Sequence, residues 1–411
     1  MKVAVIGAGA SGLMAAYATA ANGNDVAVFE KNEKCGKKIY ITGKGRCNLT
    51  NAVSPNEFLQ NVVNNSKFLT GAIYSFSPEQ TVQFFENNGL RLKTERGNRV
   101  FPASDKASDV TKCLENACRG LGVKFNFNTK IDNITILNST VSDIIVNNNP
   151  ISFDKVIVCT GGVSYPATGS TGDGYKFART AGHTVTEVKP ALCGLNLKGD
   201  YFCRMQGLSL KNVGLNIFYN GKKIKNLFGE MLFTHFGASG PLILTASSLI
   251  NRYDLKAVRL SLDLKPALTE EQLDERILRD FSQSPNKTVC AVLRELLPSS
   301  IIPETLERCK IPAEKRVNSI SKAERAALLT VIKNFDMIVS SLRPFDEAII
   351  TSGGVDVKQI NPKTMESKVV KGLYFCGEVL DVDAFTGGFN LQIAFATGFA
   401  AGNSIKCEGI L

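Results

Sequence analysis

The chain has 411 residues, of which 44% are hydrophobic, and this length predicts two or three globular domains with sizeable cores. It carries 48 Lys and Arg against 38 Asp and Glu, a formal net charge of +10, and no long basic run or interleaving of basic with aromatic residues stands out. The charge therefore favours a mild positive field that attracts an anionic cofactor or substrate over a dedicated nucleic-acid-binding segment.

The 11 cysteines show no pair of Cys-x-x-Cys motifs, and there are only two histidines, so no metal site is expected. The first predicted strand begins at Lys2, which leaves no room for a signal peptide, and no apolar run approaches the roughly 20 residues of a membrane span. We therefore expect a cytoplasmic protein with reduced thiols and no membrane partner.

The N-terminal stretch predicts a strand, a glycine-rich turn, a helix and a second strand. The turn fits the G-x-G-x-x-G pattern, in which the glycines allow a tight turn, close approach to a pyrophosphate and packing of the helix on the strand; its residues are Gly7, Ala8, Gly9, Ala10, Ser11 and Gly12. Glu30 closes the second strand, 18 positions beyond Gly12, where an acid accepts hydrogen bonds from an adenosine ribose. An acid there disfavours a bound 2′-phosphate, so the resident nucleotide is expected to be FAD or NAD.

A late segment favours FAD over NAD. A strand at 372–376 leads into a glycine, a run of acids and a final helix, which suits a carboxylate on a ribityl hydroxyl and a helix N-terminus near the flavin. The expected cofactor contacts here are Gly377, Glu378, Asp381, Asp383, Gly387, Gly388, Phe389 and Asn390.

Between these ends, residues 55–88 look helical, with Ser77 as an N-cap, and residues 123–153 look like a small antiparallel meander. A buried strand at 155–159 runs into Thr160, Gly161 and Gly162, which are also expected to contact the cofactor. Cys113 and Cys118 have the spacing of a flavin disulfide reductase pair, but they fall in a predicted surface helix far from any fingerprint.

After residue 189 the chain alternates in short strands and turns, with a hairpin signal at Tyr219–Gly221, and from Thr269 it becomes charged and helical. The fold class is therefore α/β, a glutathione-reductase-like, Rossmann-type FAD-binding domain with an inserted β-barrel domain and a small helical subdomain. The expected divisions are 1–189 and 351–411 for the FAD-binding domain, 190–267 and 336–350 for the barrel, and 268–335 for the helical insert.

Four stretches carry a resemblance to a known family, at residues 5–12, 43–51, 232–241 and 377–398; the second reads Gly-Lys-Gly-Arg-Cys-Asn-Leu-Thr-Asn. Through them the chain resembles the BaiN/RdsA-type FAD-dependent oxidoreductases, also called the aminoacetone oxidase family or YhiN-like flavoproteins. The resemblance implies a split FAD domain, a barrel and a helical insert. Because members are linked to amine oxidation and to steroid or bile-acid reduction, it does not fix the substrate.

The resemblance also implies that the 43–51 loop crosses the cofactor near the isoalloxazine. Lys37 and Lys38 can neutralise the pyrophosphate, and Arg46 supplies a fixed positive charge for an anionic substrate or the reduced flavin. Cys47 is interpreted as a small packed residue rather than a redox thiol. The contacts expected from this region are Lys31, Lys37, Lys38, Thr42, Gly43, Gly45, Arg46, Cys47 and Asn48.

The two histidines differ in their surroundings. His183 follows a glycine at a predicted helix end and is interpreted as a surface or capping residue. His235 lies in a loop bounded by Gly, Ser and Pro, and is the candidate that moves the proton accompanying hydride transfer, with Arg46 as its catalytic partner.

The leading hypothesis is an enzyme that transfers hydride between flavin N5 and a small organic substrate. Two versions stay open, an oxidase that passes electrons to oxygen and a reductase that receives them from NAD(P)H. Because only one dinucleotide fingerprint is convincing, NAD(P)H would visit the flavin transiently. The alternative, suggested by the charge, is a flavin-containing nucleic-acid-binding or RNA-modifying protein.

Overall fold

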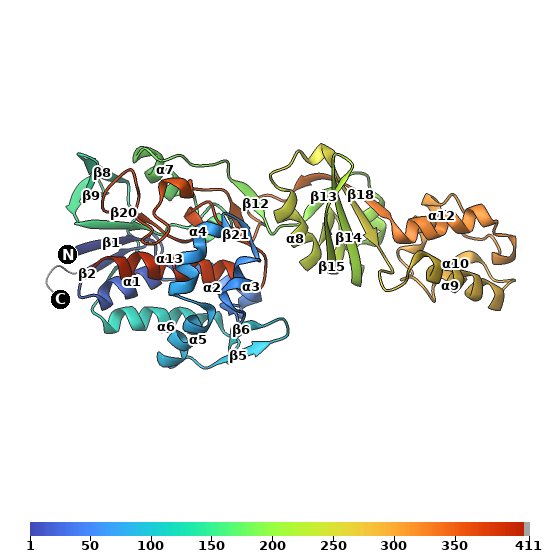
Figure 1. Cartoon of the computed structure of the whole chain (residues 1–411), viewed down its shortest axis with the longest axis horizontal. Helices are drawn as coiled ribbons and strands as arrows, with labels where there is room; N and C mark the ends of the chain where they lie inside the picture. Colours follow the sequence, from blue (N-terminus) through green and yellow to red (C-terminus); the bar gives the residue numbers. More distant parts are fainter. Residues whose placement is uncertain (407–411) are drawn as a thin grey trace. The chain divides into compact units, whose positions relative to one another are not determined.

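The structure is a computed structural model that describes residues 1–406, and it consists of two compact units (Figure 1). Unit 1 is formed by residues 1–191 together with the segment from Phe345 onwards, and unit 2 by residues 192–344. Each unit has its own cluster of buried hydrophobic residues. The predicted α/β fold with an inserted barrel and a helical subdomain is confirmed.

Unit 1 is built on a five-stranded parallel sheet. The strands in spatial order are β20 (Leu373–Phe375), β11 (Lys155–Val158), β1 (Lys2–Ile6), β2 (Asp25–Phe29) and β7 (Lys124–Asn126). The apolar runs of β20, β11, β1 and β2 are mostly buried, as strands covered on both faces must be, whereas β7 at the edge of the sheet is not buried. The sheet joins the first and last parts of the chain, because β11 pairs with both β1 and β20.

Two helices of small residues pack closely beside this sheet. Helix α13 (Phe389–Ser404) lies along α1 (Ala10–Ala21) (Figure 1). Their backbones approach closely, since a Cβ on Gly398 would lie 2.3 Å from the Ser11 carbonyl oxygen and one on Gly402 would lie 2.5 Å from that of Ala15. Unit 1 also contains α2 (Lys37–Ile41), α3 (Pro55–Leu59), α4 (Ser66–Ser75), α5 (Pro78–Asn87), α6 (Ala107–Gly120) and α7 (Asp173–Thr180).

Smaller sheets complete unit 1. They are the meander β8 (Asn133–Leu137), β9 (Thr140–Val146) and β10 (Asn149–Ser152); the sheet of β3 (Thr50–Asn51), β5 (Leu92–Glu95) and β6 (Arg99–Pro102); and the pairs β4 (Val62–Asn64) with β21 (Asp383–Ala384) and β12 (Lys189–Ala191) with β19 (Ile350–Ser352). The predicted meander was too long, because its first strand, β7, joins the parallel sheet instead. The predicted helical region at 55–88 holds three helices interrupted by β4, and Ser77 caps α5 as expected.

Unit 2 is a closed barrel extended by a group of helices (Figure 1). The barrel strands are β13 (Leu195–Leu197), β16 (Gly237–Ser239), β15 (Lys222–Thr234), β14 (Ser209–Tyr219), β17 (Val258–Asp263) and β18 (Phe335–Leu342), with α8 (Pro241–Ile250) between β16 and β17. The expected hairpin joins β14 and β15 through Asn220 and Gly221, whose φ values of 48° and 75° suit a type I′ turn.

The helical insert lies between β17 and β18 and consists of α9 (Glu270–Gln283), α10 (Val289–Leu293), α11 (Ile302–Arg308) and α12 (Lys322–Lys333). Two boundaries differ from those expected, since unit 2 begins at Leu192 rather than at 190 and ends at Pro344 rather than at 350. The barrel strand β18 ends at Leu342, and the chain returns to unit 1 at Phe345 rather than at 351. The reason is that β19 pairs with β12, so the strands flanking the insertion both belong to unit 1.

Two expectations about exposure were wrong. Helix α6 is not a surface helix remote from the fingerprint, because Cys118 is fully buried and its thiol donates to the Leu13 carbonyl of α1 at 3.2 Å. His183 is not on the surface, because it is 4% exposed and its Nε2 lies 2.8 Å from Ser367 Oγ. Burial lowers the pKa of His183, which favours the neutral imidazole. Both residues are parts of the unit 1 interior.

Candidate functional site

The fingerprint turn at 7–12 has the geometry of a phosphate-binding turn. Gly7 has φ 102°, and a Cβ on it would lie 2.6 Å from the Cys159 carbonyl oxygen. A Cβ on Gly12 would lie 1.8 Å from the Gly7 carbonyl oxygen, so a larger residue is excluded at both positions. Gly9 differs, because a Cβ there would meet nothing within 4 Å. The N-terminus of α1 therefore faces open space at Gly9, and no side chain caps it.

Glu30 lies directly beside this turn at the end of β2. Its Oε2 accepts a hydrogen bond from the Ala8 N–H at 2.9 Å. Its Oε1 accepts from the Asn32 N–H at 2.9 Å and from the Asn32 side-chain amide at 2.7 Å. The carboxylate is 9% exposed, so it both supports the glycine turn and presents an acceptor at the edge of the sheet.

The 43–51 loop has an unusual backbone. Gly43, Lys44 and Gly45 all have left-handed φ values, as does Cys47 at 60°. Cys47 is completely buried, and burial raises the pKa of its thiol to about 12, which agrees with a packing role. Next to it, Asn48 Oδ1 is buried and has no hydrogen-bond partner within the described residues.

Arg46 is held by two acids rather than left free. Its guanidinium donates to Glu95 and to Asp105, and it lies over the Phe101 ring with its central carbon 4.2 Å from the ring centroid. Lys93 completes the cluster through Asp105 Oδ2 at 2.6 Å. The hydrogen bond from Arg46 lowers the pKa of Glu95, and hydrogen bonds from Lys93 and Arg46 lower the pKa of Asp105. The expected fixed positive charge is therefore largely neutralised within the protein.

The three lysines among the expected cofactor contacts are also paired with acids. Lys31 contacts Asp173 at 2.7 Å, and Lys37 contacts Glu33 at 2.9 Å. Lys38 donates to Glu378 Oε2 at 2.7 Å. Through this bond, Lys38 connects the predicted cofactor segment before the 43–51 loop to the late segment that contains Glu378.

Glu378 is the centre of a hydrogen-bond network that the sequence did not reveal. Its Oε1 accepts from Ser164 Oγ at 2.9 Å and from the Thr351 N–H at 2.8 Å, and Lys38 also donates to Ser164 Oγ at 2.6 Å. A Cβ on Gly162 would lie 2.4 Å from Thr351 Oγ1. Ser164 lies in a loop and Thr351 in the short strand β19, and neither belongs to a recognisable motif. The only sequence feature that pointed to Ser164 was its position just after Gly161–Gly162, and for Thr351 it was the predicted strand at 351.

The predicted segments of unit 1 lie against one another. A Cβ on Gly377 would lie 2.6 Å from Ser11 Oγ, which joins the late segment to the fingerprint. Asn51 Nδ2 donates to the Gly387 carbonyl at 2.9 Å, which joins the 43–51 loop to the turn before α13. Asn390 is a structural residue of that turn, since its side chain bonds the Ala384 N–H and carbonyl.

The acids Asp381 and Asp383 are 5% and 1% exposed, respectively. Asp383 Oδ1 accepts from Asn64 Nδ2 at 2.5 Å and from Ser352 Oγ at 3.1 Å, and Asn65 Nδ2 donates to the Asp381 carbonyl at 2.6 Å. The β4–β21 region therefore holds the side chain of Asp383 and the backbone of Asp381. Thr42 likewise has a local role, since its hydroxyl donates to the Ile39 carbonyl at 2.7 Å.

The site has features that a bound dinucleotide would satisfy. Two buried polar atoms in predicted cofactor segments, Asn48 Oδ1 and Thr160 Oγ1, have no hydrogen-bond partner within residues 1–406. Such atoms are costly unless a ligand or water meets them. Together with the open space before Gly9 and the uncapped α1 N-terminus, they fit the hydroxyls and phosphates of FAD.

His235 belongs to unit 2. It is exposed, in the turn between β15 and β16, and its ring contacts Phe236 edge-on at 5.1 Å between centroids. Its backbone carbonyl accepts from the Cys203 thiol at 3.6 Å. An exposed imidazole on a tight turn is available to a ligand, so its catalytic role stays a prediction.

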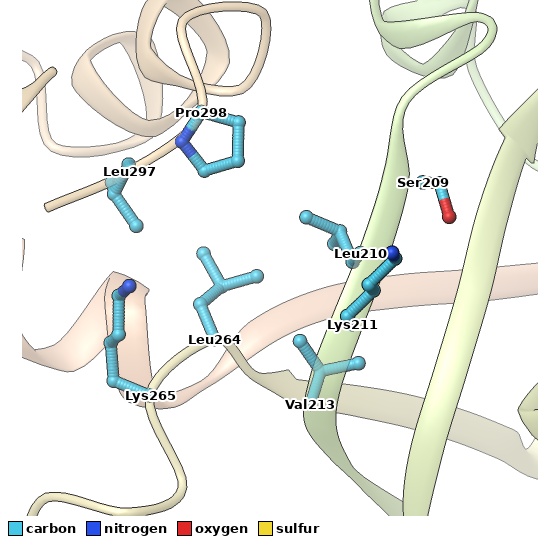
Figure 2. Close-up of a pocket in the computed structure, with 8 residues that line it drawn as sticks. All are labelled: Ser209, Leu210, Lys211, Val213, Leu264, Lys265, Leu297 and Pro298. Carbon is cyan, nitrogen blue, oxygen red and sulfur yellow. The ribbon is translucent and has the colours of Figure 1, made fainter.

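A cavity of about 270 Å³ lies in unit 2, between β14, the residues that follow β17 and the segment that links α10 to α11 (Figure 2). Apolar side chains and two lysines line it, and the lining residues are Ser209, Leu210, Lys211, Val213, Leu264, Lys265, Leu297 and Pro298. Burial lowers the pKa of Lys265. None of the predicted cofactor or catalytic residues lines this cavity.

Comparison with known families decides the relationship. The model of the HI0933-like protein Rossmann domain matches residues 1–404. The chain belongs to this family. The predicted kinship with BaiN- and RdsA-type proteins is confirmed at the same time.

Three curated relatives of this HI0933-like chain match it over nearly their whole length. The 3-dehydro-bile acid delta(4,6)-reductase of Clostridium scindens is 31% identical, with 98% of each chain covered. The ribosomal RNA dihydrouridine synthases of Haemophilus influenzae and Escherichia coli are 30% and 26% identical; 98% of this chain is covered in both cases, with 98% and 97% of the relatives. All three are named as enzymes, and the prediction that this chain is an oxidoreductase enzyme is confirmed.

Solved structures support the fold. A 3-ketosteroid-delta4-(5alpha)-dehydrogenase from Rhodococcus jostii gives a TM-score of 0.54 at 15% identity, covering 98% of this chain and 96% of that one. A flavocytochrome c3 fumarate reductase gives 0.51 at 16% identity, covering 98% and 77%. In residues 1–406 no helix is long and apolar enough to cross a membrane, and no group of three or more His, Cys, Asp or Glu is arranged to hold a metal ion.

Proposed function

We propose that this chain binds FAD at the carboxyl edge of the unit 1 sheet. The observation that carries the proposal is the convergence there of the fingerprint turn, the Glu30 carboxylate and the late segment at Gly377, with Asn48 Oδ1 and Thr160 Oγ1 buried and unpartnered beside them in the described chain. The α1 N-terminus would hold the pyrophosphate, Glu30 the adenosine ribose, and the 43–51 loop with the α13 N-terminus the flavin end.

We propose further that the enzyme reduces a carbon–carbon double bond conjugated to a carbonyl group. The named relatives support this, because a delta(4,6) 3-dehydro-steroid and the uracil ring of uridine both contain such a bond. FAD supplies hydride chemistry at N5. Hydride addition to the carbon remote from the carbonyl leaves negative charge on the carbonyl oxygen, and a proton must reach the neighbouring carbon.

His235 is the proposed source of that proton. It is exposed on a tight turn, and an imidazole is the side chain best suited to give or take a proton near neutral pH. Arg46 is proposed to act by positioning, because its pairing with Glu95 and Asp105 and its stacking on Phe101 fix the loop that borders the flavin.

The electron donor proposed is NAD(P)H, which reaches the flavin transiently. The described chain contains one glycine fingerprint before a parallel strand–helix unit, at 7–12, so a separate nicotinamide domain has no evident place in it. The second version, an oxidase that passes electrons to oxygen, is an outcome of the experiment below.

Two substrate classes compete, a small conjugated ketone and a uridine within RNA. The small molecule is supported by the relative at 31% identity. RNA is supported by the two relatives named as ribosomal RNA dihydrouridine synthases. It is also supported by the net positive charge of the chain.

Anaerobic reduction of the purified protein by NADH, NADPH or candidate amines tests the proposal. The reduced protein is then mixed with a 4-ene-3-keto steroid, with a uridine-containing ribosomal RNA transcript, or with air. We expect a yellow protein that releases FAD on denaturation and is reoxidised by one conjugated substrate faster than by air. His235→Ala should slow that reoxidation by about 10² to 10⁴ without loss of FAD. A colourless protein that cannot take up FAD, or rapid reduction by amines with reoxidation only by air, would refute the proposed reaction.

A further inference from the structure

The positive charge of the chain is concentrated in unit 2. Residues 192–344 contain 22 Lys and Arg against 15 Asp and Glu, so this unit carries +7 of the total +10. Three of its lysines, Lys222, Lys223 and Lys225, lie at the start of β15, at the tip of the long β14–β15 hairpin, and all three are exposed. None of them forms an ion pair within the described chain, so their charge is available to a partner.

The same hairpin carries an exposed aromatic surface. Phe228, on β15, is 65% exposed, and Phe218, on β14, is half-buried beneath Arg259, whose guanidinium carbon lies 4.2 Å from the ring centroid. Strand pairing places Phe218 between Lys223 and Arg259, so basic and aromatic residues alternate across the strands. Along the sequence this alternation is hidden, because the three residues lie on different strands.

Amide groups lie between these aromatic residues. Asn226 Nδ2 donates to Asn216 Oδ1 at 2.8 Å across the hairpin, which shows that both side chains lie on the outer face. Phe228 is two positions from Asn226 on the same strand and therefore shares that face. We call the outer face formed by Asn216, Phe218, Lys223, Asn226 and Phe228, with Lys222 and Lys225 at its tip, the hairpin face.

We propose that the hairpin face binds RNA. Unpaired lysines match phosphates, the exposed Phe228 ring can stack with a base, and side-chain amides can hydrogen-bond to base edges. Proteins recognise single-stranded and looped RNA through groups of these kinds. The choice of RNA over other polyanions rests on the RNA substrate class in the proposed function. Acids near the hairpin face, which would repel phosphates, are few. Glu230 lies two residues beyond Phe228 on β15, and Asp336 is already paired with Arg259 at 2.7 Å.

The dimensions of unit 2 also suit a polymer. The tip lysines and His235 lie at opposite ends of β15, which spans residues 222–234 and is therefore about 40 Å long. A steroid is too short to contact both ends, whereas a strand of RNA can lie along the hairpin and reach the β15–β16 turn. An anionic membrane surface would also attract the lysines, but the hairpin presents amides between its two rings rather than a continuous apolar patch.

Binding of the full-length FAD-loaded protein to a transcript of the large ribosomal RNA tests the proposal. The variant Lys222→Gln/Lys223→Gln/Lys225→Gln should bind at least tenfold more weakly at 100 mM salt, and the slope of log Kd against log salt should fall by about 2 to 3. The matched control, Lys287→Gln/Lys310→Gln/Lys322→Gln, removes three exposed lysines of the helical insert and should retain most of the affinity.

A second pair of variants tests the aromatic part without changing charge. Phe228→Ala should weaken RNA binding about fivefold or more, because one stacked base is lost, whereas Leu137→Ala, at a 60% exposed position in unit 1, should not. Equal losses of RNA affinity in the two triple lysine variants would overturn the proposal, because they would show non-specific electrostatic attraction to the whole unit. Binding to phosphatidylglycerol vesicles but not to RNA would overturn it in favour of a membrane.

The same experiment separates this inference from the proposed function. RNA binding that depends on the hairpin lysines, in a protein that reduces no uridine, would refute the RNA substrate while supporting the hairpin face. Uridine reduction with unchanged RNA affinity in the lysine triple would refute the hairpin face alone. Circular dichroism of every variant establishes that the substitutions leave the fold intact.

Discussion

Among single residues, Glu30 has a structural role in addition to the ribose contact that its position in the sequence predicts. It accepts hydrogen bonds from the Ala8 N–H and from Asn32, and so it fixes the glycine turn in addition to its proposed contact with the ribose. Glu30→Ala removes both functions, whereas Glu30→Gln keeps one carbonyl oxygen as an acceptor for the turn.

We therefore expect Glu30→Gln to weaken FAD binding by roughly 1.5–3 kcal/mol, or about tenfold or more in Kd, because hydrogen bonds to a charged acceptor are lost. The stability of the protein should change little. Glu30→Ala should also lower the thermal midpoint. FAD titration by fluorescence measures the first effect and thermal unfolding of the apoprotein the second. Glu79→Gln, at an exposed acid of α5, is the control, and equal affinity in Glu30→Gln and this control would remove Glu30 from the ribose site.

Arg46 is the second residue whose role the structure changes. If it anchors the loop through Glu95 and Asp105, then Glu95→Gln/Asp105→Asn should reproduce most of the effect of Arg46→Gln on FAD affinity. If instead its charge acts directly on a ligand, removal of the two acids should leave affinity unchanged or increase it. FAD dissociation constants of the three proteins at pH 7.5 decide between these outcomes.

The anchor also predicts a dependence on pH. The pKa values of Glu95 and Asp105 are lowered in the folded protein. The stabilisation that their charged carboxylates provide is therefore complete above the ordinary pKa values of 4.5 and 3.8, and it is lost as the pH falls through the lowered pKa values. Wild-type protein should therefore release FAD in a step at acid pH that Glu95→Gln/Asp105→Asn lacks. Identical release profiles of the two proteins would contradict the anchoring role.

At the scale of elements, the contact between α1 and α13 connects the end of the chain to the fingerprint. A Cβ on Gly398 would lie 2.3 Å from the Ser11 carbonyl oxygen, and backbone cannot yield as a flexible side chain can. Gly398→Ala should therefore destabilise the protein by about 1–3 kcal/mol and weaken FAD binding, because α1, which carries the proposed phosphate site, must move.

Gly120→Ala is the matched control for this substitution. Gly120 is also helical, at the end of α6, but a Cβ there would meet nothing within 4 Å, so alanine should be neutral or slightly stabilising. Thermal unfolding and FAD titration of both variants provide the test. Unchanged stability and affinity in Gly398→Ala would show that the two helices can separate without cost.

Elements with strong local patterns could be predicted from the sequence, whereas long-range pairings could not. The strands around the fingerprint, the Asn220–Gly221 hairpin and the capped start of α5 follow from apolar runs, turn residues and a capping serine. By contrast, β7 was placed in the meander, because a short strand carries no sign of its partner. Cys118 and His183 are buried by contacts with α1 and Ser367, which lie far away in sequence.

The candidate site shows the same division. Glycines and acids at strand ends mark the predicted cofactor segments, because tight turns require glycine and ribose hydroxyls favour a charged acceptor. The partners of Arg46 and of the lysines were not predictable, because each salt bridge joins segments whose approach depends on the complete fold. Ser164 and Thr351 were missed for that reason, although both bond Glu378.

At the scale of the whole molecule, unit 2 has the properties of an independently folding module. Its buried hydrophobic cluster, from Leu195 to Val339, is separate from that of unit 1. Its two ends meet within the barrel, because Leu195 on β13 pairs with Leu342 on β18 and the Arg343 N–H donates to the Gly194 carbonyl at 3.0 Å. On the other side of the junction, β12 and β19 pair with each other.

We therefore expect residues 192–344 to fold when expressed alone. A closed barrel has no open edge, and the cut ends of this segment lie on paired neighbouring strands, so excision breaks no strand pairing inside the module. The isolated segment should show a cooperative thermal transition by circular dichroism and dispersed amide signals by NMR. A shorter segment that ends at Asn334 lacks β18, which pairs with both β13 and β17, and should not fold. If the full segment is also without a cooperative transition, the barrel depends on unit 1 for its stability, and the insertion is a domain only in the geometric sense.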